Sequence, residues 1–569
     1  MTNFNHFCKI LLYIFIFLGI SNSAFPKILE FNQGDKSISN YFSGTISFDN
    51  YDYASSQSFF KKMEKVETKN EKYLSMHIQS LVNLEKYQEA YKYSKKLEKM
   101  NKSSFDSNLF LGIYHFKSQN FSKSKNYFKM LEFQQKQNLE QDLVLEILKT
   151  SLLAWAQISD LQNKNDLKML NLRNPAFDNL TIIQKTFGNC FLKLDNTENE
   201  FMRVINDNTI NFSRYHFFVS NYLNNNQKKK DAINIIMSAS EKFPSNLLIN
   251  QFKKVLNNEE TNKNIFNCEN STHILAELFY ILANVLSSQE NYKLSNFYIN
   301  IAKFLNPKFR SYNSLLAENF NNLEKYNQAK KIYKKMYENG STYKWYSAKQ
   351  IALIMKKKKG PDPNKFLLQT YKTLNTGVSE TFDLANFLKS NEKYKEAINL
   401  YSKILTEIDQ TNKLYPDVLE RRGMAYERSD NWLLGEKDLI ESLKVRPKEP
   451  YVMNYLAYSW IEKNQNINKA LKMLREANNL KKNNGYITDS LGWALFKTKN
   501  FSEAKKYLQI AIMLMPRDPV INDHFADCLW MNDNKIQARY YWNNALKFDA
   551  DEKIKKKIKR KILFGLENI

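Results

Sequence analysis

Histidine and cysteine are the residues best suited to chemistry in this 569-residue chain, and neither occurs in a catalytic or metal-binding spacing. Beyond residue 24 the histidines are His77, His115, His216, His273 and His524. No pair follows the His-Glu-x-x-His pattern of helical zinc sites, and the chain has neither a phosphate-binding glycine loop nor a Gly-x-Ser-x-Gly turn. We therefore predict a protein that is not an enzyme and that uses no cofactor or metal.

The cysteines do not suggest a zinc site either. Beyond residue 24 they are Cys190, Cys268 and Cys528, whose wide separation matches no common set of zinc ligands. Three cysteines in an oxidising compartment cannot all pair with one another. One disulfide and three packed thiols are therefore both compatible with the sequence.

The first 24 residues have the layout of a secretory signal peptide. Lys9 precedes an apolar run at 10–20, and the small residues Ser21, Ser23 and Ala24 follow it. The run is too short to cross a bilayer as a stable helix. We expect export to the periplasm, with cleavage near the end of segment 1–24.

Composition favours helices and argues against a nucleic-acid partner. Aromatic residues make up 14% of the chain, while Gly (13) and Pro (11), which sheet-rich folds use in turns, are scarce. The formal charge of +25 would suit an anionic partner. However, the lysines are scattered along the whole chain, so we do not expect nucleic-acid binding.

Small residues divide segment 485–518 into two amphipathic helices. Gly492 in the first helix, and Ala504 and Ala511 in the second, recur at helical spacing among larger apolar residues, with a break at 499–500. Small side chains are needed where the two helices cross, because a large one would push the helix axes apart. We call the first helix of such a unit the A helix and the second the B helix.

The same pattern recurs with a period of 34 residues. Eight units follow one another almost without gaps between residues 276 and 552, although the unit at 344–377 keeps only the length. The remaining predicted segments are N-terminal repeats at 25–138, irregular hairpins at 139–275 with one regular unit at 213–246, and a basic C-terminal capping helix at 553–569.

This pattern resembles the tetratricopeptide repeat (TPR) family, which combines Trp, Leu-Gly, Tyr, Ala, Phe and Pro over 34 residues. The resemblance implies an all-α fold, a right-handed α-solenoid of tandem TPR helical hairpins. Stacked hairpins share a continuous core, because one hairpin cannot bury its apolar face alone. In this family the A helices line a concave groove that binds peptides or protein surfaces, so the implied partner is a protein or peptide.

Within the repeats, one face of the A helices carries the candidate partner-binding residues. Helical spacing directs positions 2, 5, 9 and 12 of each unit away from the B helix. In the last three regular units the candidates are Tyr451, Asn454, Tyr458, Tyr486, Asp489, Trp493, Phe496, Asp523, Asp527 and Trp530. Aromatic rings supply contact area, and acids and amides bind backbone or charge. Packing of the aromatics at positions 9 and 12 on the next A helix is an equal alternative.

Position within a unit also predicts the environment of three histidines. His77 and His115 fall at positions 7 and 11, which face inward, so we expect packed core residues and not ligands. His524 falls at position 6, where we expect a surface residue.

The last segment, 553–569, predicts a basic amphipathic helix. Ile554, Ile558 and Ile562 form one apolar stripe that can cover the last repeat. The lysines that we expect to face water are Lys555, Lys556, Lys559 and Lys561. The alternative to a cap is a helix that lies on an anionic membrane surface.

The C-terminal block resembles that of exported proteobacterial TPR proteins. The matching stretches are 456–458, 489–493, 519–524 and 538–542, with Ala457 in place of the usual Gly. These relatives are periplasmic or outer-membrane lipoproteins, and some are adaptors for a carboxy-terminal processing protease. Cys8 precedes the apolar run, so it cannot be a lipoprotein cysteine.

The resemblance therefore implies a periplasmic scaffold or adaptor. Its implied partner is a periplasmic protease or an envelope assembly complex. The alternative is a cell-envelope or polysaccharide-export accessory protein that binds glycan or a membrane surface. The sequence identifies neither the partner nor the oligomeric state.

Overall fold

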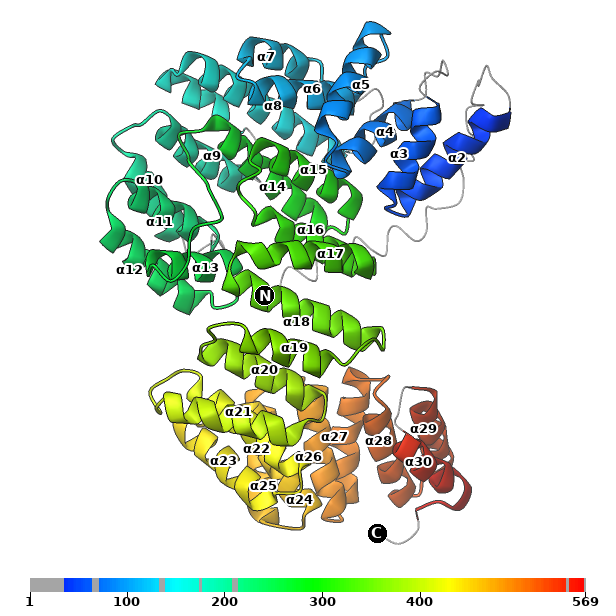
Figure 1. The fold of residues 1–569 in the computed structure, drawn as a ribbon. Helices are drawn as coiled ribbons and strands as arrows, with labels where there is room; N and C mark the ends of the chain where they lie inside the picture. Colours follow the sequence, from blue (N-terminus) through cyan, green and yellow to red (C-terminus); the bar gives the residue numbers. More distant parts are fainter. Residues whose placement is uncertain are drawn as a thin grey trace. The chain divides into compact units, whose positions relative to one another are not determined.

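The computed structural model describes residues 35–63, 71–131, 139–172, 177–206, 213–548 and 552–566 (Figure 1). The predicted signal segment 1–24 lies outside these residues and stays a prediction. Within the described ranges the regular elements are helices. The same ranges also contain one isolated antiparallel bridge, between Asn264 and Phe309. The predicted all-α fold of tandem helical hairpins is confirmed.

The chain divides into two compact units, Met1–Ile354 and Met355–Ile569. The division falls inside helix α18 and therefore inside the predicted array 276–552. The α-helices of the first unit are α2 (Asp35–Asp49), α3 (Tyr53–Lys62), α4 (Glu71–Asn83), α5 (Tyr87–Lys99), α6 (Phe105–Lys117), α7 (Phe121–Lys129), α8 (Leu139–Leu161), α9 (Asp178–Phe191), α10 (Thr197–Asn206), α11 (Tyr215–Asn225), α12 (Lys229–Lys242), α13 (Leu247–Leu256), α14 (Ser271–Ser288), α15 (Tyr292–Leu305), α16 (Tyr312–Asn322), α17 (Tyr326–Met336) and α18 (Ser341–Lys357).

Short 3₁₀ helices, η1 (Lys164–Leu170) and η3 (Tyr337–Asn339), also belong to the first unit. The second unit continues with α19 (Pro363–Lys372), α20 (Val378–Ser390), α21 (Tyr394–Glu407), α22 (Tyr415–Arg428), α23 (Trp432–Val445), α24 (Pro450–Glu462), α25 (Ile467–Leu480), α26 (Gly485–Lys497), α27 (Phe501–Leu514), α28 (Pro519–Met531), α29 (Lys535–Lys547) and α30 (Glu552–Phe564).

Many of the hairpins turn through a residue with positive φ, and some add a side-chain cap at the start of the B helix. Between α26 and α27, Lys499 adopts φ 63°, and the side chain of Asn500 accepts a hydrogen bond from the backbone N–H of Glu503. This left-handed residue ends the A helix, and the cap satisfies an otherwise free donor at the start of the B helix. The turn is therefore tight enough for the two helices to pack along their length.

Small residues mark the helix crossings, as the sequence predicted. Ala504 and Ala511 are completely buried in α27, and a Cβ at Gly492 would lie only 2.6 Å from Cγ of Leu508. Helices that approach this closely leave no room for a larger side chain. One apolar cluster of the second unit extends from Leu439 in α23 to Ile558 in α30, and Met453, Ala477 and Ile487 form a smaller one.

The first unit folds back on itself. Helix α15 packs against α4, and the Tyr87 hydroxyl donates to the carbonyl of Asn300, 213 positions away (3.0 Å). Lys303 of α15 forms an ion pair with Glu85 in the turn before α5 (2.6 Å). The A–B turns of the N-terminal hairpins are thus covered by a later helix of the same unit.

Two further long-range links hold the first unit. Arg214 donates to the buried carboxylate of Glu277 through two nitrogens, at 2.7 and 3.0 Å, and its guanidinium lies 4.1 Å from the Tyr280 ring centroid. Cys190 and Cys268 form a disulfide, which decides a pairing that the sequence left open. Cys528 is a free, buried thiol.

Candidate partner-binding face

The candidate face of the second unit begins with a row of exposed residues at the start of consecutive A helices. Tyr451 in α24 is 48% exposed, Tyr486 in α26 is 55% exposed, and Val520 in α28 is also exposed. Each occupies the second position of its helix. The repeat therefore places aromatic or apolar side chains at regular intervals along one edge of the unit.

One turn further along the same helices lies a row of hydrogen-bond acceptors. Asn454 is half-buried, and Asp489 and Asp523 are buried. In the described part of the chain, Oδ1 of Asn454 and Oδ1 of Asp489 have no hydrogen-bond partner. Buried acceptors without a donor are costly, so such groups call for an explanation.

The next position, position 9, carries aromatic side chains in the first two helices of the row. Tyr458 and Trp493 are both half-buried. The Trp493 ring stacks on His524 of α28, with centroids 4.0 Å apart, and its Nε1 donates to Oε1 of Glu462 at 2.7 Å. Trp493 therefore packs on the next A helix, as the packing alternative predicts, yet keeps part of its surface open.

Phe496 does not belong to the accessible face. It is 2% exposed, lies in the apolar cluster of the second unit, and stacks under Trp493 with ring centroids 5.0 Å apart. Its position at the end of α26 turns the ring toward Phe501 and the B helix. Here the packing alternative describes the residue, because the turn between the two helices closes over it.

His524 was predicted at the surface, and this prediction was wrong. The residue is 7% exposed, and its Nδ1 lies 2.9 Å from Oδ2 of Asp489. Burial lowers the pKa of His524, but the carboxylates of Asp489, Asp523 and Asp527 together raise it above its ordinary value. A search for an acid one repeat earlier could have found this pair, since Asp489 and His524 are 35 positions apart.

Lys561 was predicted to face water, and this prediction was also wrong. It is 6% exposed, and its Nζ donates to Asp523 (2.8 Å) and to Oδ2 of Asp527 (2.7 Å). Burial and the charge of Asp523 raise the pKa of Asp527 to about 6, while Lys561 opposes that shift. Helix α30 therefore lies over the last acidic positions of the face.

The last aromatic candidate, Trp530, is likewise covered by the C-terminal segment. A Cβ at Gly565 would lie 2.2 Å from the Trp530 ring, so the backbone after α30 touches that ring directly. Trp530 also packs against Trp542, and the Arg539 guanidinium lies 4.9 Å from its ring centroid. Of the ten candidates, Tyr451 and Tyr486 are thus the most open, and those of α28 are occupied by the chain itself.

Comparison with known proteins supports the repeat assignment. The chain is 26% identical over 112 residues to the TPR repeat-containing protein PA4667 of Pseudomonas aeruginosa, a match that covers 19% of each chain. This chain therefore spans about a fifth of that relative's length. Together with the 34-residue hairpins, this similarity decides the type of repeat. The chain is built from tetratricopeptide repeats.

No family model matches the chain. Among solved structures, the APC/C Cut9–Hcn1 hetero-tetramer matches 93% of this TPR chain and 90% of its own, at 13% identity and TM-score 0.34. YrrB, a TPR protein with an unusual peptide-binding site, matches 34% of this chain and 97% of its own, at 15% identity and TM-score 0.26. Such low scores add nothing to the repeat assignment.

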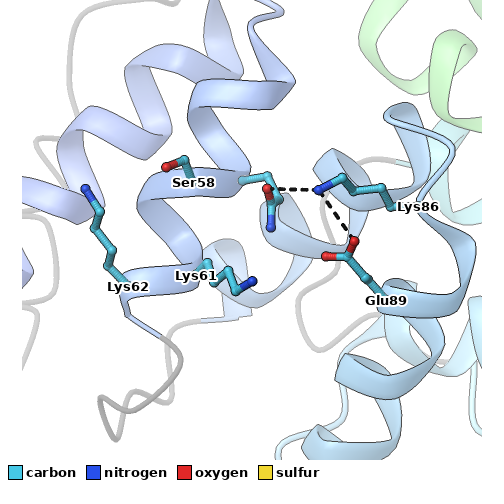
Figure 2. Close-up of a pocket in the computed structure, with 6 residues that line it drawn as sticks. Ser58, Lys61, Lys62, Lys86 and Glu89 are labelled. Carbon is cyan, nitrogen blue, oxygen red and sulfur yellow. Dashed lines mark hydrogen bonds and ion pairs between the residues drawn. The ribbon is translucent and has the colours of Figure 1, made fainter.

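A hollow lies in the first unit of the TPR chain, away from the predicted candidates. Its volume is about 620 Å³, and it lies between α3 and α5 (Figure 2). Lys86 Nζ reaches both Oε1 of Gln57 and Oε1 of Glu89 at 3.5 Å. Lys61 and Lys62 also line this hollow. Sequence analysis missed it, because its lining comes from two hairpins.

Metal clusters and membrane-spanning helices are absent from the described residues. Within them, no three His, Cys, Asp or Glu side chains gather as a metal site would require. None of the helices described has the length and apolarity needed to cross a bilayer. His77 is completely buried against aromatic rings, whereas His115 is half-buried and stacks on Tyr127.

Proposed function

We propose that this TPR chain is an exported, non-catalytic scaffold or adaptor that binds a protein or peptide on the A-helix face of its second unit. The supporting observation is the exposed pair Tyr451 and Tyr486, which lies beside acceptors of Asn454 and Asp489 that have no donor in the described chain. Tyrosine rings supply large contact areas at low entropic cost, and free acceptors suit backbone N–H groups or cations.

Export to the periplasm is the second part of the proposal. It rests on the apolar run and small residues of segment 1–24. A periplasmic protease or an envelope assembly complex is the partner class that the C-terminal resemblance suggests. An accessory protein that binds glycan is the other candidate, because exposed tyrosines such as Tyr451 and Tyr486 could also stack on sugars.

The test replaces the two open tyrosines together, in a Tyr451→Ser, Tyr486→Ser chain. We expect capture of partners by crosslinking in the periplasm to fall about tenfold or more, since exposed aromatic anchors dominate such interfaces. The matched control is Tyr540→Ser, which removes an equally exposed tyrosine from the B helix α29.

Binding that survives the double substitution would contradict the proposed face, and an equal loss in the Tyr540→Ser control would show that the effect is not specific to that face. Phe496 is unsuitable for this test, because its loss would open a cavity in the core. A parallel assay with peptidoglycan and soluble polysaccharide separates the two candidate functions. Retention of polymer in place of protein would favour the envelope accessory role.

A further inference from the structure

The buried ammonium of Lys561 is the feature of the second unit that the repeat pattern does not explain. Among the described residues it is the only buried lysine. Its Nζ lies 2.7–2.8 Å from all four carboxylate oxygens of Asp523 and Asp527. Two carboxylates around one ammonium form a strong, charge-assisted receptor for a lysine side chain.

The two carboxylates occupy positions of the candidate partner-binding face in the last repeat. Asp523 occupies the same position in α28 that Asp489 occupies in α26 and Asn454 occupies in α24. In the last repeat this acceptor is satisfied by Lys561, whereas Oδ1 of Asp489 and Oδ1 of Asn454 have no donor among the described residues. Helix α30 thus provides a lysine donor to the last repeat, whereas in the repeat before it His524 meets only Oδ2 of Asp489.

The helix that delivers Lys561 is held by few side chains. Of its isoleucine stripe only Ile558 is fully buried, while Ile554 and Ile562 are half-buried. Its end exposes Leu563 and Phe564. By contrast, α28 buries an unbroken run from Ile521 to Leu529. Terminal elements with few buried contacts open at the lowest free energy, so α30 is the segment of this unit easiest to displace.

We propose that Asp523 and Asp527, beside Trp530, form a receptor for a lysine on an amphipathic helix of a protein partner, and that α30 is the chain's own occupant, which such a helix displaces. The recognised pattern is that of α30, with isoleucines at 554, 558 and 562 and the lysine at 561. This inference names the partner class for the proposed function and rests on it.

The experiment uses the full chain and three synthetic peptides. The first has the sequence of residues 552–566, and the others carry Lys561→Gln or Lys559→Gln. The two substituted peptides have the same charge, and Lys559 is exposed on α30, so they separate recognition of one lysine from general attraction. The readout is amide hydrogen exchange of residues 552–564 in a nitrogen-15-labelled full chain, followed by mass spectrometry, so that its fragments differ in mass from those of the peptide.

We expect the native and Lys559→Gln peptides to accelerate exchange of α30 about tenfold at saturating concentration. The Lys561→Gln peptide should need at least about tenfold more peptide for the same effect, because a buried carboxylate pair without its cation resists a neutral substitute. In the chain itself, Lys561→Gln should accelerate exchange of α30 without any peptide, and Lys559→Gln should not.

Two results would overturn the inference. If no peptide accelerates exchange of α30, the helix is a permanent cap of the last repeat. If both substituted peptides act equally, the attraction is one of net charge alone. Neither result depends on Tyr451 or Tyr486, so the proposed function can survive the failure of this inference, and the two failures can be told apart.

Discussion

The two units satisfy their buried polar groups in different ways. In the first unit the partners come from far along the chain, as in Arg214–Glu277, 63 positions apart, and Tyr87–Asn300, 213 positions apart. In the second unit they come from the next repeat, as in Asp489–His524, 35 positions apart. The first unit therefore covers itself, while the second remains a simple stack.

This difference bears on the proposed binding face. A simple stack leaves its A-helix face uncovered unless something lies on it. Among the described residues of the second unit, α30 covers the end of that face at Asp523 and Asp527. In the first unit, α15 packs on the A helix α4. The contrast supports the proposal that partners bind on the second unit.

The largest expected effect tests whether the first unit depends on its long-range ion pair. Arg214→Met leaves the carboxylate of Glu277 buried without its cation, and burial already raises the pKa of Glu277. We expect the free energy of unfolding of this unit to fall by about 3–5 kcal/mol. Urea unfolding with peptide-resolved hydrogen exchange would measure the change.

The matched control comes from the second unit. Arg446 pairs with Asp417 at 2.9 Å, and both side chains are exposed. Arg446→Met should cost no more than about 1 kcal/mol, since exposed pairs are weak. Equal costs for the two substitutions would remove the contrast between the units.

A second test reduces the disulfide of the first unit. Cys190 and Cys268 are 78 positions apart, so their link restrains a long loop of the unfolded chain. We expect reduction to lower the free energy of unfolding of the first unit by about 2–4 kcal/mol. The second unit, whose cysteine is the buried free thiol Cys528, should not respond. A Cys190→Ala, Cys268→Ala chain that unfolds like the oxidised protein would refute the expectation.

A third test compares one helix crossing from each unit. A Cβ at Gly112 would meet the Phe128 ring at 2.4 Å, whereas a Cβ at Gly435 would meet the backbone oxygen of Gly423 at 2.7 Å. A ring can tilt, but a backbone cannot move without shifting its helix. We expect both alanine substitutions to cost about 1–3 kcal/mol, with Gly435→Ala the more costly. Thermal unfolding of each variant measures the two costs, and a larger loss of stability for Gly112→Ala would contradict this expectation.

The sequence predicted what repeats within a hairpin and missed what depends on neighbouring hairpins. Ala504 and Ala511 could be placed at a helix crossing because their spacing alone requires it. His524 and Lys561 were misplaced because their partners lie on other elements: Asp489 belongs to the preceding repeat, and the carboxylates around Lys561 belong to α28. Periodicity treats each helix in isolation. The packing of α15 on α4 joins hairpins that lie far apart in the sequence, which the period of a single repeat does not specify.

The smallest effect is a pH dependence of opposite sign in the two units. In the first unit, burial and then the charges of Lys96 and Lys61 lower the pKa of His77 to about 3. The unfolded state binds the proton more tightly, so stability is lost as the pH falls below about 6.5. In the second unit, the pKa of His524 is raised, and that of Asp527 is raised to about 6. The folded unit binds these protons more tightly, so the contribution of Asp527 to stability is lost as the pH rises from about 4 to about 6. The contribution of His524 is lost as the pH rises above the ordinary histidine pKa.

Single substitutions isolate each contribution from the other titrating groups. Relative to His77→Phe, the wild-type first unit should lose about 1–2 kcal/mol of unfolding free energy between about pH 7 and pH 5. Relative to Asp527→Asn, the wild-type second unit should lose stability in the opposite direction, as the pH rises from about 4 to about 6. Urea unfolding at these pH values, with proteolytic fragments assigned to each unit, gives both slopes. If the free energy of unfolding of both units changes with pH in the same direction, the expected electrostatic difference between the two units is wrong.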